Sequence, residues 1–223
     1  MYIIVLGGFV MKYGESFFDI AYLIIAIGIG VYMLAKASNK LQKLMGAAAL
    51  VLGCGDAFHL VPRVLNYFVD KDFSAALGAG KLITSITMTV FYILMYYIFL
   101  NNYEVQESKG ITATVWGLSA IRIALCLFPQ NEWFSNNSPL LWGILRNIPF
   151  AILGLVIVCL YFKCRKDDRC FRFIWLYVTL SFLFYIPVVV GADAVPILGA
   201  LMLPKTICYL LILFTFLKKK KNA

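Results

Sequence analysis

Charged residues and histidine are both scarce in this 223-residue chain. Only 14% of the residues are charged, whereas average soluble domains carry about 25%, and the chain holds a single histidine. One histidine excludes a histidine-rich zinc site, and the six cysteines show no Cys-x-x-Cys spacing. The sequence therefore predicts neither a metal site nor a cofactor.

Apolar residues, in contrast, are abundant. Hydrophobic residues make up 62% of the chain, and the mean hydropathy is +0.87. A soluble fold of this size cannot hide so much apolar surface. The composition indicates an all-α, multi-pass membrane protein, and it excludes a disordered chain, a secreted disulfide scaffold and a nucleic-acid-binding domain.

Seven apolar runs are each about 20 residues long, the length that crosses a bilayer as a helix. We expect helices at residues 17–35, 44–69, 76–100, 111–129, 139–162, 173–191 and 195–217. Residues 1–16 are expected to form a short outer segment, because their apolar stretch is too short to span. Residues 218–223 are expected to form a basic cytoplasmic tail, so the whole chain 1–223 is one transmembrane domain.

The basic residues of the loops predict the orientation. Thirteen of them follow the first, third, fifth and seventh predicted helices, whereas the opposite side has only Lys12 and Lys71. Lys and Arg accumulate on the cytoplasmic side of membranes. The N-terminus is therefore expected outside and the C-terminus inside, in the cell membrane. The net charge of +9 then reflects topology, and no nucleic-acid partner is expected.

The first three and the last three predicted helices resemble each other. In the alignment, Asp19 falls opposite Asn147, and Lys81 falls opposite Lys205. This pattern predicts two parallel three-helix repeats joined by the fourth helix, an arrangement that commonly places a ligand site between the halves. The alternative is that apolar helices align without any structural relation.

Five basic residues lie within the predicted spans, and the acid nearest the middle of a span is Asp56. Charges inside a bilayer cost about 2.5–3.5 kcal/mol each on insertion scales, and they usually face the bundle interior. Asp19 and Asp193 lie at the outer ends of spans. The five basic residues are Arg63, Lys81, Arg122, Arg146 and Lys205.

These charges gather in the predicted outer halves of the helices, a pattern that favours a pocket open to the outside. The excess of positive charge predicts an anionic ligand with a phosphate or carboxylate group, which Arg would bind in a bidentate manner and Lys as a point charge. Asn147, Tyr185 and Tyr209 are expected to add hydrogen-bonding groups to this site.

Asp56, His59 and Arg63 have the spacing i, i+3, i+7, so they share one helix face. Structural interpretations of these residues stay open. Asp56 can neutralise Lys205 or Arg63, and His59 can be an ordinary hydrogen-bonded interior histidine. Lys81 and Arg146 can extend toward lipid headgroups.

The Gly55-Asp56 pair within LVLGCGDAFHL and the following segment 77–96 resemble two helices of the lysoplasmalogenase family of integral membrane hydrolases. This resemblance implies a membrane-embedded lipid hydrolase, in which Asp56 and His59 would do general acid–base work. At the level of architecture alone, the 3+1+3 arrangement is similar to that of PQ-loop and sugar-carrier proteins.

Two functions follow from these patterns. The first is binding, with transport as its extension, of an anionic small molecule or lipid headgroup in an outward-facing cationic pocket. The second is lipid hydrolysis by Asp56 and His59. We favour binding because the positive charges outnumber the acid–base groups. The expected partners are membrane lipids and the anionic ligand, and small-residue patches such as Gly28 and Gly30 leave a homo-oligomer open.

Overall fold

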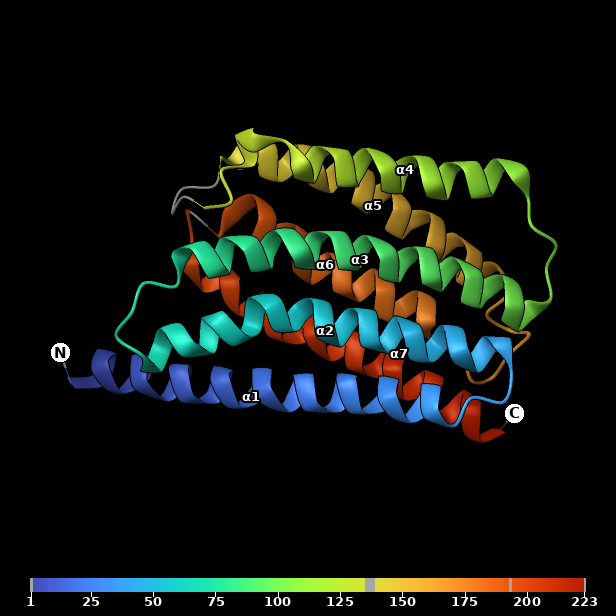
Figure 1. Ribbon diagram of the computed structural model, residues 1–223, viewed down its shortest axis with the longest axis horizontal. Coiled ribbons are helices and arrows are strands. Elements are labelled where there is room, and N and C mark those ends of the chain that lie inside the picture. Colours follow the sequence, from blue (N-terminus) through green and yellow to red (C-terminus); the bar gives the residue numbers. More distant parts are fainter. Residues whose placement is uncertain (1, 135–138, 193, 223) are drawn as a thin grey trace.

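The computed structural model describes residues 2–134, 139–192 and 194–222 (Figure 1). Within them, seven segments are long and apolar enough to cross a membrane, which confirms the predicted all-helical, multi-pass class. The α-helices are α1 (Tyr2–Ala35), α2 (Lys40–Phe68), α3 (Ser74–Tyr103), α4 (Lys109–Leu127), α5 (Leu140–Lys163), α6 (Ile174–Gly191) and α7 (Met202–Asn222). Two short 3-10 helices are η1 (Pro129–Asn131) and η2 (Pro196–Leu201).

The N-terminal segment differs from the expected outer segment 1–16. Helix α1 begins at Tyr2 and continues without a break into the first span. The physical reason is that no proline interrupts the chain between Tyr2 and the span, so nothing ends the helix there. The first helix is therefore longer than the predicted 17–35.

The C-terminal helix also differs from its predicted bounds of 195–217. The 3-10 helix η2 precedes it, with Pro196 in its first turn, and α7 itself begins only at Met202. The expected tail 218–223 continues α7 as far as Asn222. Lysines are favourable in this last turn because the C-terminal end of a helix carries partial negative charge. Asp193 lies outside the described residues.

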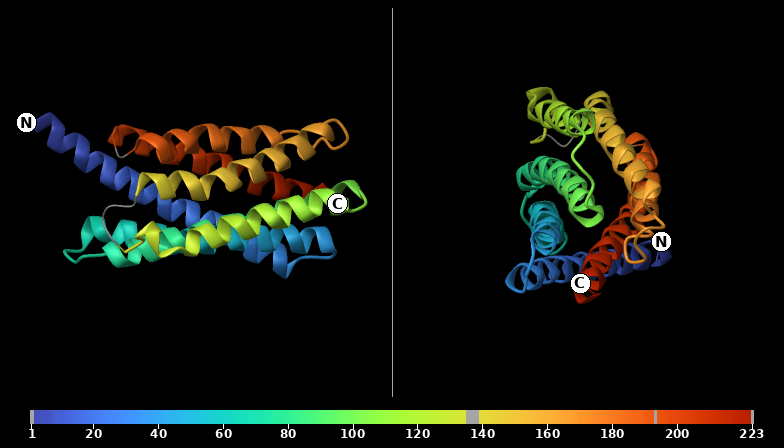
Figure 2. Two further views of the ribbon diagram at one scale, coloured as in Figure 1. Left: turned by 90° about the horizontal axis from the view of Figure 1, so that it is seen from above. Right: turned by 90° about the vertical axis from the view of Figure 1, so that its right-hand side faces the viewer.

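The helices form a ring in chain order. Each helix packs against the next one, and α1 packs against α7 to close the ring, as the end-on view in Figure 2 shows. Helix α3 also contacts α5, and α2 contacts α7. The two termini lie at opposite ends of the bundle. The inside–outside orientation and the 3+1+3 repeat stay predictions.

Helices α2 and α3 approach closely at Gly80. A Cβ atom added at Gly80 would lie 2.0 Å from the carbonyl oxygen of Phe58. That carbonyl lacks its usual partner within α2, because the residue four positions later is Pro62, which has no N–H. One turn further along α3, the Thr84 hydroxyl donates a hydrogen bond to the Gly55 carbonyl at 3.0 Å. These contacts fix α3 against α2.

Aromatic side chains fill the bundle at mid-height. Tyr92 packs edge-on against Phe150 and Phe182, with ring centroids 5.0 and 5.7 Å apart, and Tyr209 packs against Phe91 at 5.8 Å. We refer to these five side chains as the aromatic layer. Below it, toward the C-terminus, lies a second cluster of rings in edge-on and tilted contact, which contains Phe99, Tyr161, Phe171 and Phe216. The half of the bundle that carries the C-terminus is therefore densely packed.

At that same end, Asp168 ties the α5–α6 connection to two helices. Its carboxylate accepts hydrogen bonds from the Lys219 ammonium at 2.8 Å, the Asn102 amide at 3.1 Å and the backbone N–H of Cys170 at 2.7 Å. Partial burial raises the pKa of Asp168, but these three donors outweigh it and hold the pKa below its ordinary value. Folding therefore favours the ionised carboxylate.

Replacing Gly80 by alanine should destabilise the protein, because the added methyl group meets backbone that cannot rotate away. We expect Gly80→Ala to cost about 1–3 kcal/mol, as overpacking does, and to lower the melting temperature in detergent. Gly117→Ala in α4 is the matched control, since a Cβ there meets nothing within 4 Å. Equal melting temperatures for the two variants would contradict the close contact.

Replacing Asp168 by asparagine should lower the melting temperature at pH 7, by less than about 1 kcal/mol because the group is partly exposed. A lowered native pKa contributes stability above the unfolded pKa of about 3.9 and loses it as the pH falls further. The difference between wild type and Asp168→Asn should therefore shrink between pH 4 and pH 3. Asp167→Asn serves as the control, and a difference independent of pH would rule out the ionic contribution.

Candidate functional site

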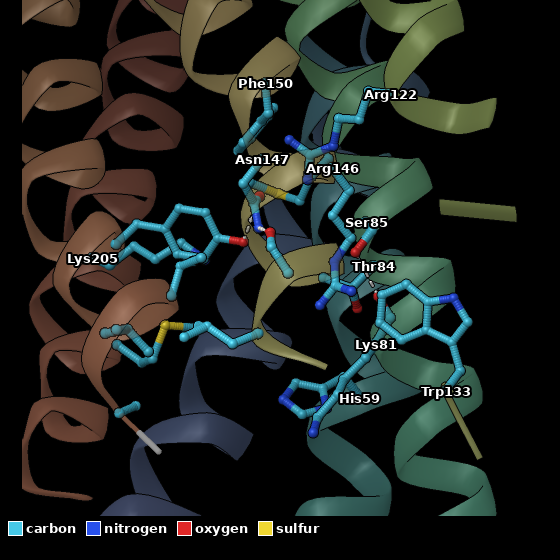
Figure 3. A pocket seen from close by; sticks show the side chains of 18 of the residues that line it. His59, Lys81, Thr84, Ser85, Arg122, Trp133, Arg146, Asn147, Phe150 and Lys205 are labelled. Carbon is cyan, nitrogen blue, oxygen red and sulfur yellow. Dashed lines mark hydrogen bonds between the residues drawn. The ribbon is translucent and has the colours of Figure 1, made fainter. Parts of the chain in front are cut away.

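A cavity of about 290 Å³ lies in the half of the bundle that carries the N-terminus (Figure 3). Side chains from α2 to α7 and from the α4–α5 connection line it, and none of the described lining residues is acidic. We call it the cationic cavity because four of the five basic residues within the predicted spans line it: Lys81, Arg122, Arg146 and Lys205. Phe150 of the aromatic layer also lines it.

Seven of the ten predicted site residues line this cavity. Besides the four basic residues, they are His59, Asn147 and Tyr185. Helices remote in sequence therefore bring most of the predicted site together. The remaining three residues, Asp56, Arg63 and Tyr209, are not among the lining residues.

Arg122 is the most buried of the basic residues. It is only 2% exposed, and its guanidinium lies over the Phe150 ring, 3.3 Å from the centroid. The Nε and Nη1 atoms have no hydrogen-bond partner among the described residues. A cation–π contact satisfies the charge in part, but it leaves these two N–H donors for another acceptor.

Arg146 is held in place by the α4–α5 connection. Its Nη1 donates to the Asn131 side-chain oxygen at 2.7 Å, and its guanidinium lies 4.3 Å from the centre of the Trp133 ring. Asn131 donates to the Leu125 carbonyl, and the Trp133 indole donates to the Cys126 carbonyl. Backbone carbonyls at the end of α4 thus hold Asn131 and Trp133 in place, and these two side chains in turn position the Arg146 guanidinium.

Lys205 approaches the cavity from the first turn of α7. Its ammonium lies 4.5 Å from the Tyr185 ring centroid and 5.7 Å from that of Tyr209. Among the described residues no carboxylate lies within 4 Å of it. Lys205 therefore contributes a positive charge that lies against aromatic faces and that the Asp56 carboxylate attracts without forming a salt bridge.

Helices α2 and α3 supply the remaining polar wall. His59 lies near Lys81 in Figure 3, and Thr84 and Ser85 line the same cavity. The Nδ1 atom of His59 is buried and has no hydrogen-bond partner among the described residues. Since a neutral imidazole can donate or accept at this atom, it can meet either kind of ligand group.

Asp56 is directed toward α1 instead. Its carboxylate accepts a hydrogen bond of 2.6 Å from the hydroxyl of the buried Tyr22. Neither Lys205 nor Arg63 forms a salt bridge with it, and no hydrogen bond joins it to His59, all four residues being described. The structure therefore does not bring Asp56 and His59 together as an acid–base pair.

Arg63 belongs to a separate polar cluster between α1 and α2. It forms a salt bridge and hydrogen bond with Glu15, and its Nη1 lies 3.9 Å from the carboxylate of the buried Asp19. Tyr67 donates to the other Glu15 oxygen at 2.8 Å. Arg63 is thus neutralised within the chain, unlike its predicted role as a ligand-binding residue of the cavity.

Tyr209 lies at the base of the site, within the aromatic layer. Its hydroxyl is 3.5 Å from that of Tyr92, and its ring is buried. The sequence predicted a hydroxyl that contacts the ligand. The structure instead places Tyr209 under Lys205, where its ring faces the ammonium.

Several residues at these sites were not predicted. Thr84 and Ser85 were recognisable, because they follow Lys81 at i+3 and i+4 on the same helix face. Glu15 was missed because its segment was taken to lie outside the bundle. Asn131 and Trp133 belong to a connection whose fold depends on tertiary contacts, and no local pattern marks them.

Comparisons of the chain with protein-family models, curated protein sequences and solved structures give no match. The chemistry of the site must therefore be argued from its own residues. Its lining offers cationic and neutral hydrogen-bond donors, and within the described part of the chain no group of His, Cys, Asp or Glu could hold a metal ion.

Replacing Arg63 by glutamine should destabilise the protein without weakening the binding of an anionic ligand. The change leaves Glu15 and Asp19 without their counter-charge, and an unpaired, partly buried charge costs about 1–3 kcal/mol. We expect a lower melting temperature and an unchanged affinity for glycerol 3-phosphate.

The double variant Arg63→Gln/Glu15→Gln should recover part of the lost stability, because it removes one of the two unpaired carboxylates. A normal melting temperature combined with a lost affinity would instead place Arg63 in the ligand site.

Proposed function

We propose that this membrane protein binds an anion that carries a phosphate or carboxylate group in the cationic cavity. The observation that carries the proposal is Arg122, which is 2% exposed and has two N–H donors without a partner among the described residues. A buried donor without an acceptor costs about 1–3 kcal/mol. An anion that accepts both hydrogen bonds removes this cost.

The neighbouring basic residues support the same ligand chemistry. Arg146 is fixed by Asn131 and Trp133, and Lys205 has no carboxylate within 4 Å among the described residues. Like charges that share a poorly solvated space repel one another. A bound anion between them turns this repulsion into attraction, and the guanidinium groups favour planar oxyanions.

The size of the cavity favours a small ligand or a headgroup. Ligand cavities commonly measure about 300–1,000 Å³, and this one, at about 290 Å³, lies at the lower end. The lining includes Leu140 at the start of α5 and Ala192 just after α6, which lie at the end of the bundle that carries the N-terminus, and this placement favours access from that end. With the orientation predicted from the loop charges, this end faces the outside.

Hydrolysis by Asp56 and His59 receives less support. General acid–base work on one substrate requires both groups to reach it. Asp56, however, is bound by the Tyr22 hydroxyl, and it is not among the residues that line the cavity. The binding proposal uses residues that do line the cavity.

The proposal predicts that glycerol 3-phosphate binds to the purified wild-type protein and that Arg122→Gln and Lys205→Gln each weaken it. A charge-assisted hydrogen bond contributes about 1.5–3 kcal/mol, so we expect each affinity to fall roughly 10- to 100-fold. Isothermal titration calorimetry in detergent measures both. Neutral glycerol should not bind.

Arg169→Gln is the matched control, because it removes one arginine charge at an exposed position of the α5–α6 connection. An equal loss of affinity in Arg169→Gln would indicate a general effect of net charge. The absence of any anion binding by the wild type would exclude the proposed function. Counterflow of radiolabelled glycerol 3-phosphate in proteoliposomes then separates a carrier from a binding protein.

A further inference from the structure

A second cavity opens on the lipid-facing side of helices α5 and α6. It measures about 180 Å³, and every lining side chain except Asn147 and Tyr185 is apolar. Ile148 and Ile186, which lie on its two sides, are each 49% exposed. We call this cavity the α5–α6 groove. In a membrane, its open side faces the acyl chains of the bilayer.

The groove and the cationic cavity share one wall. Asn147, Tyr185 and Val189 line both of them. The Tyr185 hydroxyl donates to the Asn147 side-chain oxygen at 2.9 Å, which links α6 to α5 across this wall. On its cavity side, the Tyr185 ring faces the ammonium of Lys205. One side-chain hydrogen bond and the Val189 side chain thus separate the bilayer side from the positive charges.

The two helices that form the wall can bend near it. Pro149 in α5 and Pro187 in α6 each lie two residues from a member of the Asn147–Tyr185 hydrogen bond. Each proline removes one hydrogen bond of its helix and permits a kink. Further toward the C-terminus the helices are in close contact, since a Cβ added at Gly154 would lie 2.1 Å from the Phe182 ring. The helices can therefore separate at the wall while they stay together below it.

We infer that the ligand of the cationic cavity is an anionic lipid of the bilayer, which enters between α5 and α6. This inference rests on the proposed function, and it adds the source and the route of the ligand. The phosphate of the headgroup contacts Arg122, Arg146 and Lys205, and the acyl chain leaves through the α5–α6 groove. The groove, at about 180 Å³ and with a mostly apolar lining, suits a segment of a single acyl chain.

The headgroup and the chain have different roles in this arrangement. An acyl chain gains little by moving from lipid into an apolar groove, because both surroundings are equally apolar. The affinity therefore comes from the phosphate and the basic side chains. The groove decides whether a headgroup that carries a chain can be seated at all, so blocking it should exclude the lipid and spare its soluble headgroup.

A blocked groove tests this prediction. Ala151 lines the groove one helical turn after Asn147, and Ala151→Phe fills the path of the chain. We expect this variant to bind 1-oleoyl lysophosphatidate at least tenfold more weakly than the wild type and to bind glycerol 3-phosphate normally. Ala120→Phe at an exposed position of α4 is the matched control and should bind both ligands normally. Circular dichroism checks that each variant is folded.

A measurement on the unchanged protein supplements the variants. Lysophosphatidate with a photoreactive diazirine in its chain is bound to the wild type and irradiated, and the labelled peptides are identified by mass spectrometry. Labels should concentrate on residues 144–151 and 182–190. Labels on α1, α2 or α4 instead would overturn the lateral route, whether or not Ala151→Phe folds.

The outcomes separate this inference from the proposed function. Suppose that glycerol 3-phosphate binds the wild type. If Ala151→Phe then weakens the binding of both ligands equally, or leaves the binding of both unchanged, the route through the groove is wrong and anion binding stands. If neither ligand binds the wild type, both are wrong. Selective loss of the lipid in Ala151→Phe, together with labels on α5 and α6, supports the route.

Discussion

The interior of a bilayer offers no water to a charged side chain, so each charge within this bundle needs a partner from the chain or from a ligand. The structure satisfies this constraint unevenly. Arg63 has Glu15 and Asp19, and Arg146 has Asn131 and Trp133. Arg122, in contrast, lies over the face of Phe150, and two of its N–H groups have no hydrogen-bond partner among the described residues. A cation with two N–H donors that no described residue accepts thus lies on the wall of the cationic cavity.

The aromatic layer explains why the polar groups gather at one end. In the middle of the bundle Tyr92 packs edge to face against Phe150, and Tyr209 does so against Phe91, so buried rings occupy the level below the cationic cavity. Two rings of this layer also contact basic residues of the cationic cavity. The Arg122 guanidinium lies over the Phe150 ring, and the Lys205 ammonium lies over the Tyr209 ring. One set of side chains therefore both fills the middle of the bundle and contacts two of its basic residues.

The fold class and the basic residues of the cationic cavity could be predicted from the sequence, because both follow from local properties. Span length gives the helices, and a basic residue inside a span such as Arg122 must face the interior. Which of these basic residues form salt bridges within the chain could not be predicted. Arg63 and Lys205 look alike in sequence, yet only the path of α1 beside α2 gives Arg63 its partner Glu15. Trp133 lies in a connection that tertiary hydrogen bonds shape, so no periodic pattern marks it.

A protein that needed these cations only for internal stability would pair them, since an unpaired buried charge is costly and a hydrophobic replacement is often neutral or stabilising. A carboxylate that could pair with Lys205 is present, because Asp56 is near enough to attract its ammonium. Asp56 instead accepts a hydrogen bond from Tyr22 and, among the described residues, forms no salt bridge. A charge kept without a close partner is preorganised, since no internal bond has to break before an anion binds. Under the proposed function, the stability that this arrangement costs in the empty state would be returned as affinity for an anion.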